Sequence, residues 1–455
     1  MNIFSQRARL ADRWAENVRV TVSDGQIEKI EIGVKPDSAD TKVDTLLPAL
    51  TNLHSHSFQR AMAGMTEYRT AGQENFWTWR ELMYRFLNHL TPEDISAIAA
   101  LTFMEMQKSG YASVGEFHYI HHQQSGSAYD NPAELSERII EAANLTGIGL
   151  THMPVLYTYA GVQNQPLEGG QLRFGNSVDN ICKIVSMSQK AIGLLPADAR
   201  VGIAPHSLRA TSPSDIKEFL SCYPDMQVHM HIAEQNKEVS EVVEAFGARP
   251  VEWLLEHHAV DAKWCLIHAT HMTKAETIGL AKTGAVVGLC PITESNLGDG
   301  IFNGPTFLKA NGKFGIGSDS NINISLTEEL RTLEYSQRLR DQQRNIMVQG
   351  DGSVGEALYL GAASNGAQAI TRQSGSIAPG KLADLVAIDS CHPSLFALRD
   401  SQLMDGLVFA AKDTVITDVW SAGRHQVRTG VHVAEDIIKA SYFDTISNLK
   451  ERLDQ

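Results

Sequence analysis

Several histidines and one aspartate end short apolar runs in this 455-residue chain, in a pattern that suits a divalent metal. His54 and His56 form an HxH pair, whose period-two spacing puts both side chains on one face of an extended segment. His231 and Asp319 end two later runs and add a third imidazole and a carboxylate. Three histidines and one aspartate, with room left for water, are typical of a catalytic zinc site. The pattern predicts that these four residues bind Zn²⁺.

Two more residues stand where they can move protons beside such an ion. Zinc lowers the pKa of a coordinated water towards ~7, and Asp319 can accept the water proton. His268 ends the next run after His231 and can stabilise charge on the attacking oxygen, while Glu234 can carry a proton to a leaving nitrogen. Glu234 also suits a helix N-terminus, and His268 could be a core histidine. His229 shares the parity of His231, but we expect it to pack in the interior because it lies deeper in the strand.

Apolar or β-branched runs alternate with helical stretches through the middle of the chain. This alternation predicts an α/β fold with a (β/α)8 TIM-type barrel, in which the C-terminal strand ends meet on one face. The expected strands are 47–54, 112–118, 148–156, 200–206, 227–232, 264–268, 284–290 and 313–319. The polar residues expected at that face are His54, His118, His206, His231, His268 and Asp319.

Both ends of the chain have a different texture, in which apolar and polar residues alternate. Residues 15–34 predict a hairpin around Asp24-Gly25, and residues 384–389 and 414–432 predict further short strands. We expect a small β-sandwich domain from 1–47 and 376–435, a catalytic barrel over 48–375 and a C-terminal helix within 436–455.

The composition limits the partners that the protein can have. A formal net charge of −14 argues against nucleic acid or an anionic membrane as the main partner. Five scattered cysteines without a CxxC pair argue against a disulfide framework and against a cysteine zinc site. The chain shows no signal-peptide core and no apolar run of about 18 residues, so we expect a cytoplasmic protein with a small-molecule substrate.

Taken together, the series His54-x-His56, His231-x-x-Glu234, His268 and Asp319 resembles the amidohydrolase superfamily. Residues 374–389 (SGSIAPGKLADLVAID) are similar to the segment in which that superfamily returns from the barrel to the β domain. The fourth strand ends in histidine and offers no lysine that could bridge two metals. The resemblance therefore implies one Zn²⁺ per chain.

Longer motifs resemble one branch of this superfamily, the N-formimino-L-glutamate deiminase family. They are HSHSFQRAMAG at 54–64, FWTWRELMY at 76–84 and GEFHY at 115–119. The resemblance implies hydrolysis of N-formimino-L-glutamate to N-formyl-L-glutamate and ammonia, and a homodimer. It also implies that the substrate contacts come from Gln59, Arg80, Tyr119, His206 and Arg209.

The two arginines suit a dicarboxylate substrate, because a guanidinium fork matches a carboxylate in bidentate geometry. Simpler roles remain open, since Arg80 could be a solvated helix residue and Gln59 could cap a loop. A deaminase acting on guanine, cytosine or an adenosine-like ring would instead use aromatic stacking. A non-catalytic scaffold protein would have no need of the metal ligands, and iron or manganese could replace zinc in such a site.

Overall fold

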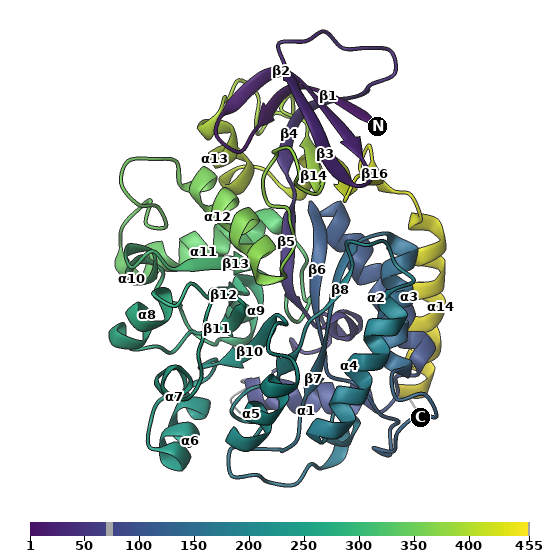
Figure 1. Ribbon diagram of the computed structural model, residues 1–455, viewed down its shortest axis with the longest axis vertical. Helices are drawn as coiled ribbons and strands as arrows, with labels where there is room; N and C mark the ends of the chain where they lie inside the picture. Colours follow the sequence, from purple (N-terminus) through teal and green to yellow (C-terminus); the bar gives the residue numbers. More distant parts are fainter. Residues whose placement is uncertain (70–75, 454–455) are drawn as a thin grey trace.

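The computed structural model describes residues 1–69 and 76–453 and shows a parallel barrel capped by a sheet built from both chain ends (Figure 1). The barrel strands are β5 (Leu50–Ser55), β6 (Tyr111–His118), β7 (Gly149–Leu156), β8 (Arg200–Val201), β9 (Ala204–Pro205), β10 (Val228–Ile232), β11 (Trp264–His268), β12 (Val286–Leu289) and β13 (Lys313–Ile316). Each of the eight predicted runs contains barrel strand, and the run 200–206 is divided into β8 and β9. The predicted fold class is confirmed.

Two parallel arcs make up the barrel, β5-β6-β7-β8 and β10-β11-β12-β13. A bridge between Ile203 and Val228 joins the arcs on one side. On the other side, Asp319 N–H donates to His54 O at 3.0 Å, and His56 N–H donates to Asp319 O at 2.9 Å. The first and last barrel strands therefore meet at the residues predicted to bind the metal.

Helices surround the barrel and follow its strands in the chain (Figure 1). The α2 helix begins at Pro92 with a reciprocal capping box between Thr91 and Asp94. The bounds are α1 (Phe76–Leu87), α2 (Pro92–Lys108), α3 (Glu134–Thr146), α4 (Val178–Ile192), α5 (Pro213–Cys222), α6 (Asn236–Phe246), α7 (Pro250–His257), α8 (Lys274–Ala281), α9 (Pro291–Leu297), α10 (Gly304–Lys309), α11 (Leu326–Asp341), α12 (Val354–Ala369), α13 (Ser401–Phe409) and α14 (Glu435–Leu453).

The two chain ends share one eight-stranded sheet, in the order β17-β16-β15-β14-β4-β1-β2-β3. Its strands are β1 (Asn2–Arg9), β2 (Trp14–Ser23), β3 (Gln26–Ile32), β4 (Thr41–Pro48), β14 (Leu385–Ile388), β15 (Ile416–Ser421), β16 (Arg424–Arg428) and β17 (Val431–His432). The expected hairpin turns at Asp24 and Gly25, both with positive φ. The sequence predicts a sandwich, but hydrogen bonds join these eight strands into one sheet. They do so because β4 pairs with both β1 and β14.

A buried ionic junction ties this sheet to the barrel. Arg372 lies between Asp384, at 2.6 Å, and Asp198, at 2.8 Å, and Arg424 of β16 reaches Asp198 at 2.7 Å. Because each buried charge has a partner, the two parts are joined in a defined register. The α14 helix runs along the outside of the barrel beside α2, and the Glu435 carboxylate lies 2.6 Å from Lys108 Nζ (Figure 1).

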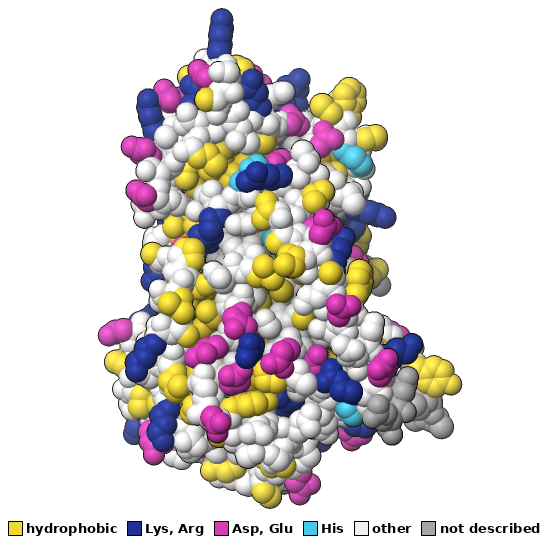
Figure 2. Space-filling model, turned by 90° about the vertical axis from the view of Figure 1, so that its right-hand side faces the viewer, with side chains coloured by type: hydrophobic (Ala, Val, Ile, Leu, Met, Phe, Trp, Pro, Cys, Tyr) yellow, Lys and Arg dark blue, Asp and Glu magenta, His cyan; other side chains and the backbone are white. Residues whose placement is uncertain are grey.

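Among the described residues, no helix combines the length and apolar character that crossing a bilayer requires. On the face shown in Figure 2, acidic and basic side chains are interspersed with apolar ones.

Candidate active site

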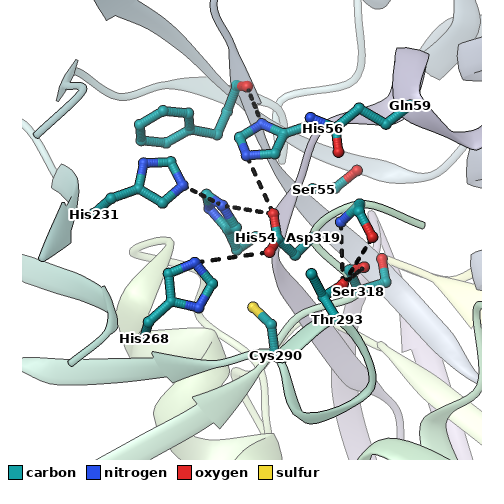
Figure 3. A network of polar contacts seen from close by, with 12 residues as sticks. His54, Ser55, His56, Gln59, His231, His268, Cys290, Thr293, Ser318 and Asp319 are labelled. Carbon is teal, nitrogen blue, oxygen red and sulfur yellow. Dashed lines mark hydrogen bonds and ion pairs between the residues drawn. The ribbon is translucent and has the colours of Figure 1, made fainter. Parts of the chain in front are cut away.

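The four predicted metal ligands meet at the C-terminal end of the barrel. Donor atoms of His54, His56, His231 and Asp319 all lie within 4.8 Å of one another, and the four side chains are buried. The Nε2 atoms of His54 and His231 are 3.1 Å apart, and Asp319 Oδ1 is 3.2 Å from His56 Nε2. Figure 3 shows the imidazole rings turned towards the aspartate.

Hydrogen bonds outside this cluster leave the inner nitrogens free to bind an ion. His56 Nδ1 donates to the Phe117 carbonyl oxygen at 2.9 Å, and His231 Nδ1 donates to the His206 carbonyl oxygen at 3.2 Å. Since a carbonyl only accepts, Nδ1 carries the hydrogen in the neutral form of each ring, and Nε2 is then the nitrogen available to a metal. Burial lowers the pKa of His54 to about 3 and so favours the neutral form of that ring. The donor set fits a divalent metal such as zinc.

Strained backbone positions aim the side chains at this site. Ala233, His268 and Asp319 follow or end barrel strands with φ values of +49°, +68° and +46°. Non-glycine residues in this region cost conformational free energy and cluster at functional sites. Close approach also matters, because a Cβ on Gly317 would lie 2.7 Å from the His54 carbonyl oxygen. The glycine before Asp319 therefore lets the end of β13 approach β5 closely.

Three carboxylates surround His268. Its Nε2 lies 3.7 Å from Asp319 Oδ2 and 3.9 Å from Glu234 Oε1, and its Nδ1 lies 3.2 Å from Glu294 Oε1. Burial acts to lower the pKa of His268, but these carboxylates raise it to about 10. The ring is thus held in its protonated form, which suits the stabilisation of negative charge.

A cavity of about 640 Å³, counted with its opening to solvent, lies over the ligand cluster. This volume is within the usual range for small-molecule sites. The predicted substrate contacts Gln59, Arg80, Tyr119, His206 and Arg209 all line it. Glu234, His268 and Asp319 line it as well, so the cavity joins the metal cluster to the predicted binding groups.

Comparison with known proteins places this site in a family. Residues 45–425 match the family model described as the amidohydrolase family. The chain belongs to the amidohydrolase family. Residues 1–44 match the model of the N-terminal domain of formimidoylglutamate deiminase HutF. The resemblances to the superfamily and to this branch are both confirmed.

Relatives of the amidohydrolase cover nearly its whole length. It is 45% identical over 450 residues to the formimidoylglutamate deiminase of Pseudomonas aeruginosa, covering 98% of this chain and 99% of the relative. A crystal structure of an amidohydrolase from Brucella melitensis superposes with a TM-score of 0.94 at 42% identity, covering 98% of this chain and 99% of that one. An adenosine deaminase from Xanthomonas campestris with bound zinc has a TM-score of 0.82 at 20% identity, covering 100% of this chain and 98% of that one, and shares the fold.

Two predicted substrate contacts of the amidohydrolase are joined by a third, unpredicted residue. Gln59 Nε2 donates to the Tyr119 hydroxyl at 2.7 Å and lies 3.5 Å from Met83 Sδ. The Tyr119 hydroxyl donates to the same sulfur at 3.6 Å. Gln59 Oε1 is buried and has no hydrogen-bond partner among the described residues. Because a thioether sulfur is a weak acceptor, the Gln59 amide and the Tyr119 hydroxyl can donate instead to a stronger acceptor that enters the cavity.

The two arginines lie in different surroundings within the cavity. Arg80 of α1 stacks on Trp77 and Tyr84, with its guanidinium carbon 4.6 Å and 5.6 Å from the ring centroids. Arg209 is 7% exposed, and its guanidinium lies 2.5 Å from Glu234 Oε2. Arg209 therefore neutralises the predicted proton carrier as well as lining the cavity.

Two of the predicted barrel histidines lie away from the cavity. His118 does not line it among the described residues and instead faces His152, with ring centroids 5.4 Å apart. The expectation that His118 meets the other strand ends is therefore wrong. Period-two geometry explains this, because its neighbours Phe117 and Tyr119 face the site. His229 is fully buried, as predicted for an interior histidine, and its Nε2 lies 2.7 Å from the Ala369 carbonyl oxygen.

Sequence reasoning missed several residues of the site. Glu294 lies in the first turn of α9 and contacts His268. In the sequence it stands only as an acidic residue that follows Cys290-Pro291 at a strand end. The α1 helix also contributes apolar lining that no spacing rule identified. Its lining residues are Phe76, Trp79, Met83 and Tyr84.

Proposed function

We propose that this amidohydrolase hydrolyses N-formimino-L-glutamate, with water, to N-formyl-L-glutamate and ammonia. One observation carries the proposal: a single cavity contains two arginines, a buried carboxylate at Glu234 and the metal-ligand cluster. The substrate has the matching groups, two carboxylates and a cationic formimino carbon centre. The similarity to the Pseudomonas aeruginosa formimidoylglutamate deiminase over almost the whole chain supports the same reaction.

The binding groups can hold the two ends of this substrate apart. Arg80 and Arg209 offer guanidinium forks for its carboxylates. Gln59 and Tyr119 offer an amide and a hydroxyl donor that, within residues 1–69 and 76–453, hydrogen-bond with each other and with Met83. His206 faces the same cavity. The formimino group would then lie in the same cavity beside the metal-ligand cluster, where Glu234 and Asp319 also line the wall.

The amidohydrolase family is metal-dependent, and we propose Zn²⁺, one per chain, as the ion. His54, His56, His231 and Asp319 would hold it, since their inner atoms share one buried centre. When bound, zinc lowers the pKa of water to about 7 and so supplies a nucleophile at neutral pH. Metal analysis of the purified chain, followed by reconstitution with Zn²⁺, Fe²⁺ or Mn²⁺, tests this choice. Full activity with iron alone would replace zinc in the proposal.

The protein's own groups then move the protons. Asp319 accepts a proton from the attacking water, and the protonated His268 stabilises the charge that develops on the oxygen. Glu234, at the edge of the cluster, receives this proton and passes it to the leaving nitrogen, and the second water proton follows from the hydroxyl that the attack forms. The C–N bond then breaks. The formyl oxygen comes from water and both water protons leave on the nitrogen, so the cationic substrate yields the amide and ammonium, which is ammonia plus a proton.

The assay compares ammonia release from N-formimino-L-glutamate, guanine and adenosine with the same enzyme sample. We expect turnover of the first compound, because a planar base offers no carboxylate to the arginines. Activity restricted to a ring substrate would overturn the proposal. No activity on any of the three in the metal-loaded protein would favour a non-catalytic role.

We further propose that the protein works in the cytoplasm as a homodimer. All five cysteines are free in the part of the chain that the structure describes, which suits a reducing compartment. Ile437 and Phe443 on α14 are each 62% exposed and offer an apolar surface for a second copy. Light scattering coupled to size exclusion measures the mass, and a monomer at micromolar concentration would contradict the dimer.

A further inference from the structure

Glu294 contacts His268 but takes no part in the proton transfers described above. Its side chain is buried, with the whole residue 6% exposed. One oxygen, Oε1, lies 3.2 Å from His268 Nδ1 and 2.9 Å from the backbone nitrogen of Cys290. A buried carboxylate that accepts two hydrogen bonds holds both donors in place.

The local fold keeps this carboxylate in position. The β12 strand ends at Leu289, and Pro291 begins α9 in the next turn. The Glu294 N–H donates to the Cys290 carbonyl oxygen at 2.8 Å, while the Glu294 side chain accepts from the Cys290 N–H. Glu294 is thus held at both its backbone and its side chain, so its position does not depend on His268.

This contact determines which nitrogen of His268 faces the cavity. A carboxylate oxygen accepts, so His268 Nδ1 carries a hydrogen and points to Glu294. The opposite nitrogen, Nε2, then lies between Asp319 Oδ2 and Glu234 Oε1, at 3.7 Å and 3.9 Å. Without Glu294, His268 Nδ1 loses its hydrogen-bond partner. The ring can then rotate about the Cβ–Cγ bond, which moves Nε2 away from both carboxylates.

A second metal site is the alternative use of this group. His268, Cys290 and Glu294 each place a possible ligand atom within 4.8 Å of the others. However, Glu294 Oε1 already accepts from a backbone N–H and from the imidazole. Hydrogen bonding therefore accounts for the position of this oxygen without an ion.

We propose that Glu294 is a positioning residue for the hydrolysis, which holds His268 with Nε2 directed at the reacting oxygen. The kinetic part of its test rests on the proposed function. A residue that acts through His268 changes the rate of the chemical step more than substrate binding. Glu294→Ala should therefore lower kcat about tenfold to a hundredfold, the usual effect of losing an outer hydrogen-bond partner. KM should change less than about threefold, within the spread expected when no substrate contact is lost.

Two further variants separate positioning from general stability. Glu294→Gln keeps an oxygen that can accept from His268, so it should recover most of the kcat lost in Glu294→Ala. Glu276→Ala is the matched control, because Glu276 is also a buried first-turn glutamate, and it accepts from the Thr273 N–H at 2.7 Å. We expect the control to lower the melting temperature and leave kcat unchanged.

Three kinetic results would overturn the proposal. They are an unchanged kcat in Glu294→Ala, a Gln variant no better than the Ala variant, and an equal kcat loss in Glu276→Ala. Metal analysis adds a fourth, since two ions per chain in the wild type and one in Glu294→Ala would make Glu294 a ligand.

Crystal structures of the wild type and Glu294→Ala test the same idea without a substrate. We expect the His268 ring to rotate in the variant while Asp319 keeps its position, and an unrotated ring would overturn the proposal. If the wild type releases no ammonia from N-formimino-L-glutamate, the proposed function fails by itself, and the ring orientation still decides the role of Glu294.

Discussion

Arg209 and Glu234 form a buried ion pair inside the cavity, with the guanidinium 2.5 Å from the carboxylate. A second carboxylate, Glu238, lies 3.7 Å from Arg209 Nε. Under the proposed function, Arg209 binds a substrate carboxylate and Glu234 moves a proton. The incoming carboxylate must then compete with Glu234 for the same guanidinium, so binding and proton transfer are linked through this pair.

Removing the arginine should weaken substrate binding. We expect Arg209→Met to raise KM about tenfold to a hundredfold, because a charge-assisted hydrogen bond contributes about 1.5–3 kcal/mol. Metal content should stay the same, since Arg209 is not among the ligands. Steady-state kinetics and metal analysis check this, with the exposed Arg344→Met as the control. An unchanged KM would exclude Arg209 as a carboxylate partner.

Removing the competing charge should have the opposite effect on KM. Glu234→Gln weakens the pair, leaving Arg209 freer to bind substrate, so KM should fall. The same change removes the proton carrier, and kcat should fall by about 10²–10⁴-fold. The two variants therefore move KM in opposite directions in one assay. A KM that rises in Glu234→Gln would show that the two residues do not compete.

Asp319→Asn should remove turnover while leaving the barrel intact. The backbone bonds between Asp319 and the segment His54–His56 do not involve the carboxylate, so the strands stay joined. We expect kcat to fall about 10²–10⁴-fold, the usual range for a lost general base. Circular dichroism should be unchanged, and Asp225→Asn, at an almost fully exposed side chain, is the control. A variant with near wild-type kcat would contradict the role of Asp319.

The Tyr119 hydroxyl should contribute to binding rather than to folding. Tyr119→Phe removes a neutral hydrogen-bond partner worth about 0.5–1.5 kcal/mol, so KM should rise about twofold to tenfold. Tyr359→Phe is a matched control, since that buried hydroxyl donates to the Pro48 carbonyl oxygen at 2.9 Å, outside the cavity lining. The control should lower stability without altering KM. Equal effects of both variants on KM would exclude a specific role for Tyr119.

Acid should weaken the attachment of α14. Burial acts to raise the pKa of Glu435, but hydrogen bonds from Lys108 and Lys439 lower it from 4.5 to about 2. The ionised Glu435 therefore contributes its full stabilisation above pH 4.5, and this stabilisation is lost as the pH falls towards 2. The difference in melting temperature between the wild type and Glu435→Gln should shrink over that interval. Glu451→Gln, at an exposed residue of the same helix, should show no such trend.

The sequence predicts the barrel well because parallel strands buried on both faces are continuous apolar runs. The strand ends at His54, His231, His268 and Asp319 follow from the same argument, since their positions depend only on the local strand. His118 shows where this argument stops. Alternate residues of a strand face opposite sides, so His118 points away from the cavity while its neighbours Phe117 and Tyr119 face the site.

Contacts between distant segments were not predictable in this way. The Arg209–Glu234 pair, the Met83 contact with Gln59 and Tyr119, and the Glu294–His268 bond each join side chains from different loops or helices. Their formation depends on tertiary geometry, including the positive φ values at His268 and Asp319. The single terminal sheet likewise depends on β4 pairing with a strand from the far end of the chain.

The closure of the barrel between His54 and Asp319 has a consequence for how the protein is made. The ribosome releases the first histidine ligands early, but the carboxylate ligand emerges only with the final barrel strand. A nascent chain that has not reached this strand cannot present all four donors to a cation. Binding of metal by all four donors is therefore a late event, which needs about 70% of the chain to have been synthesised, since Asp319 is residue 319 of 455.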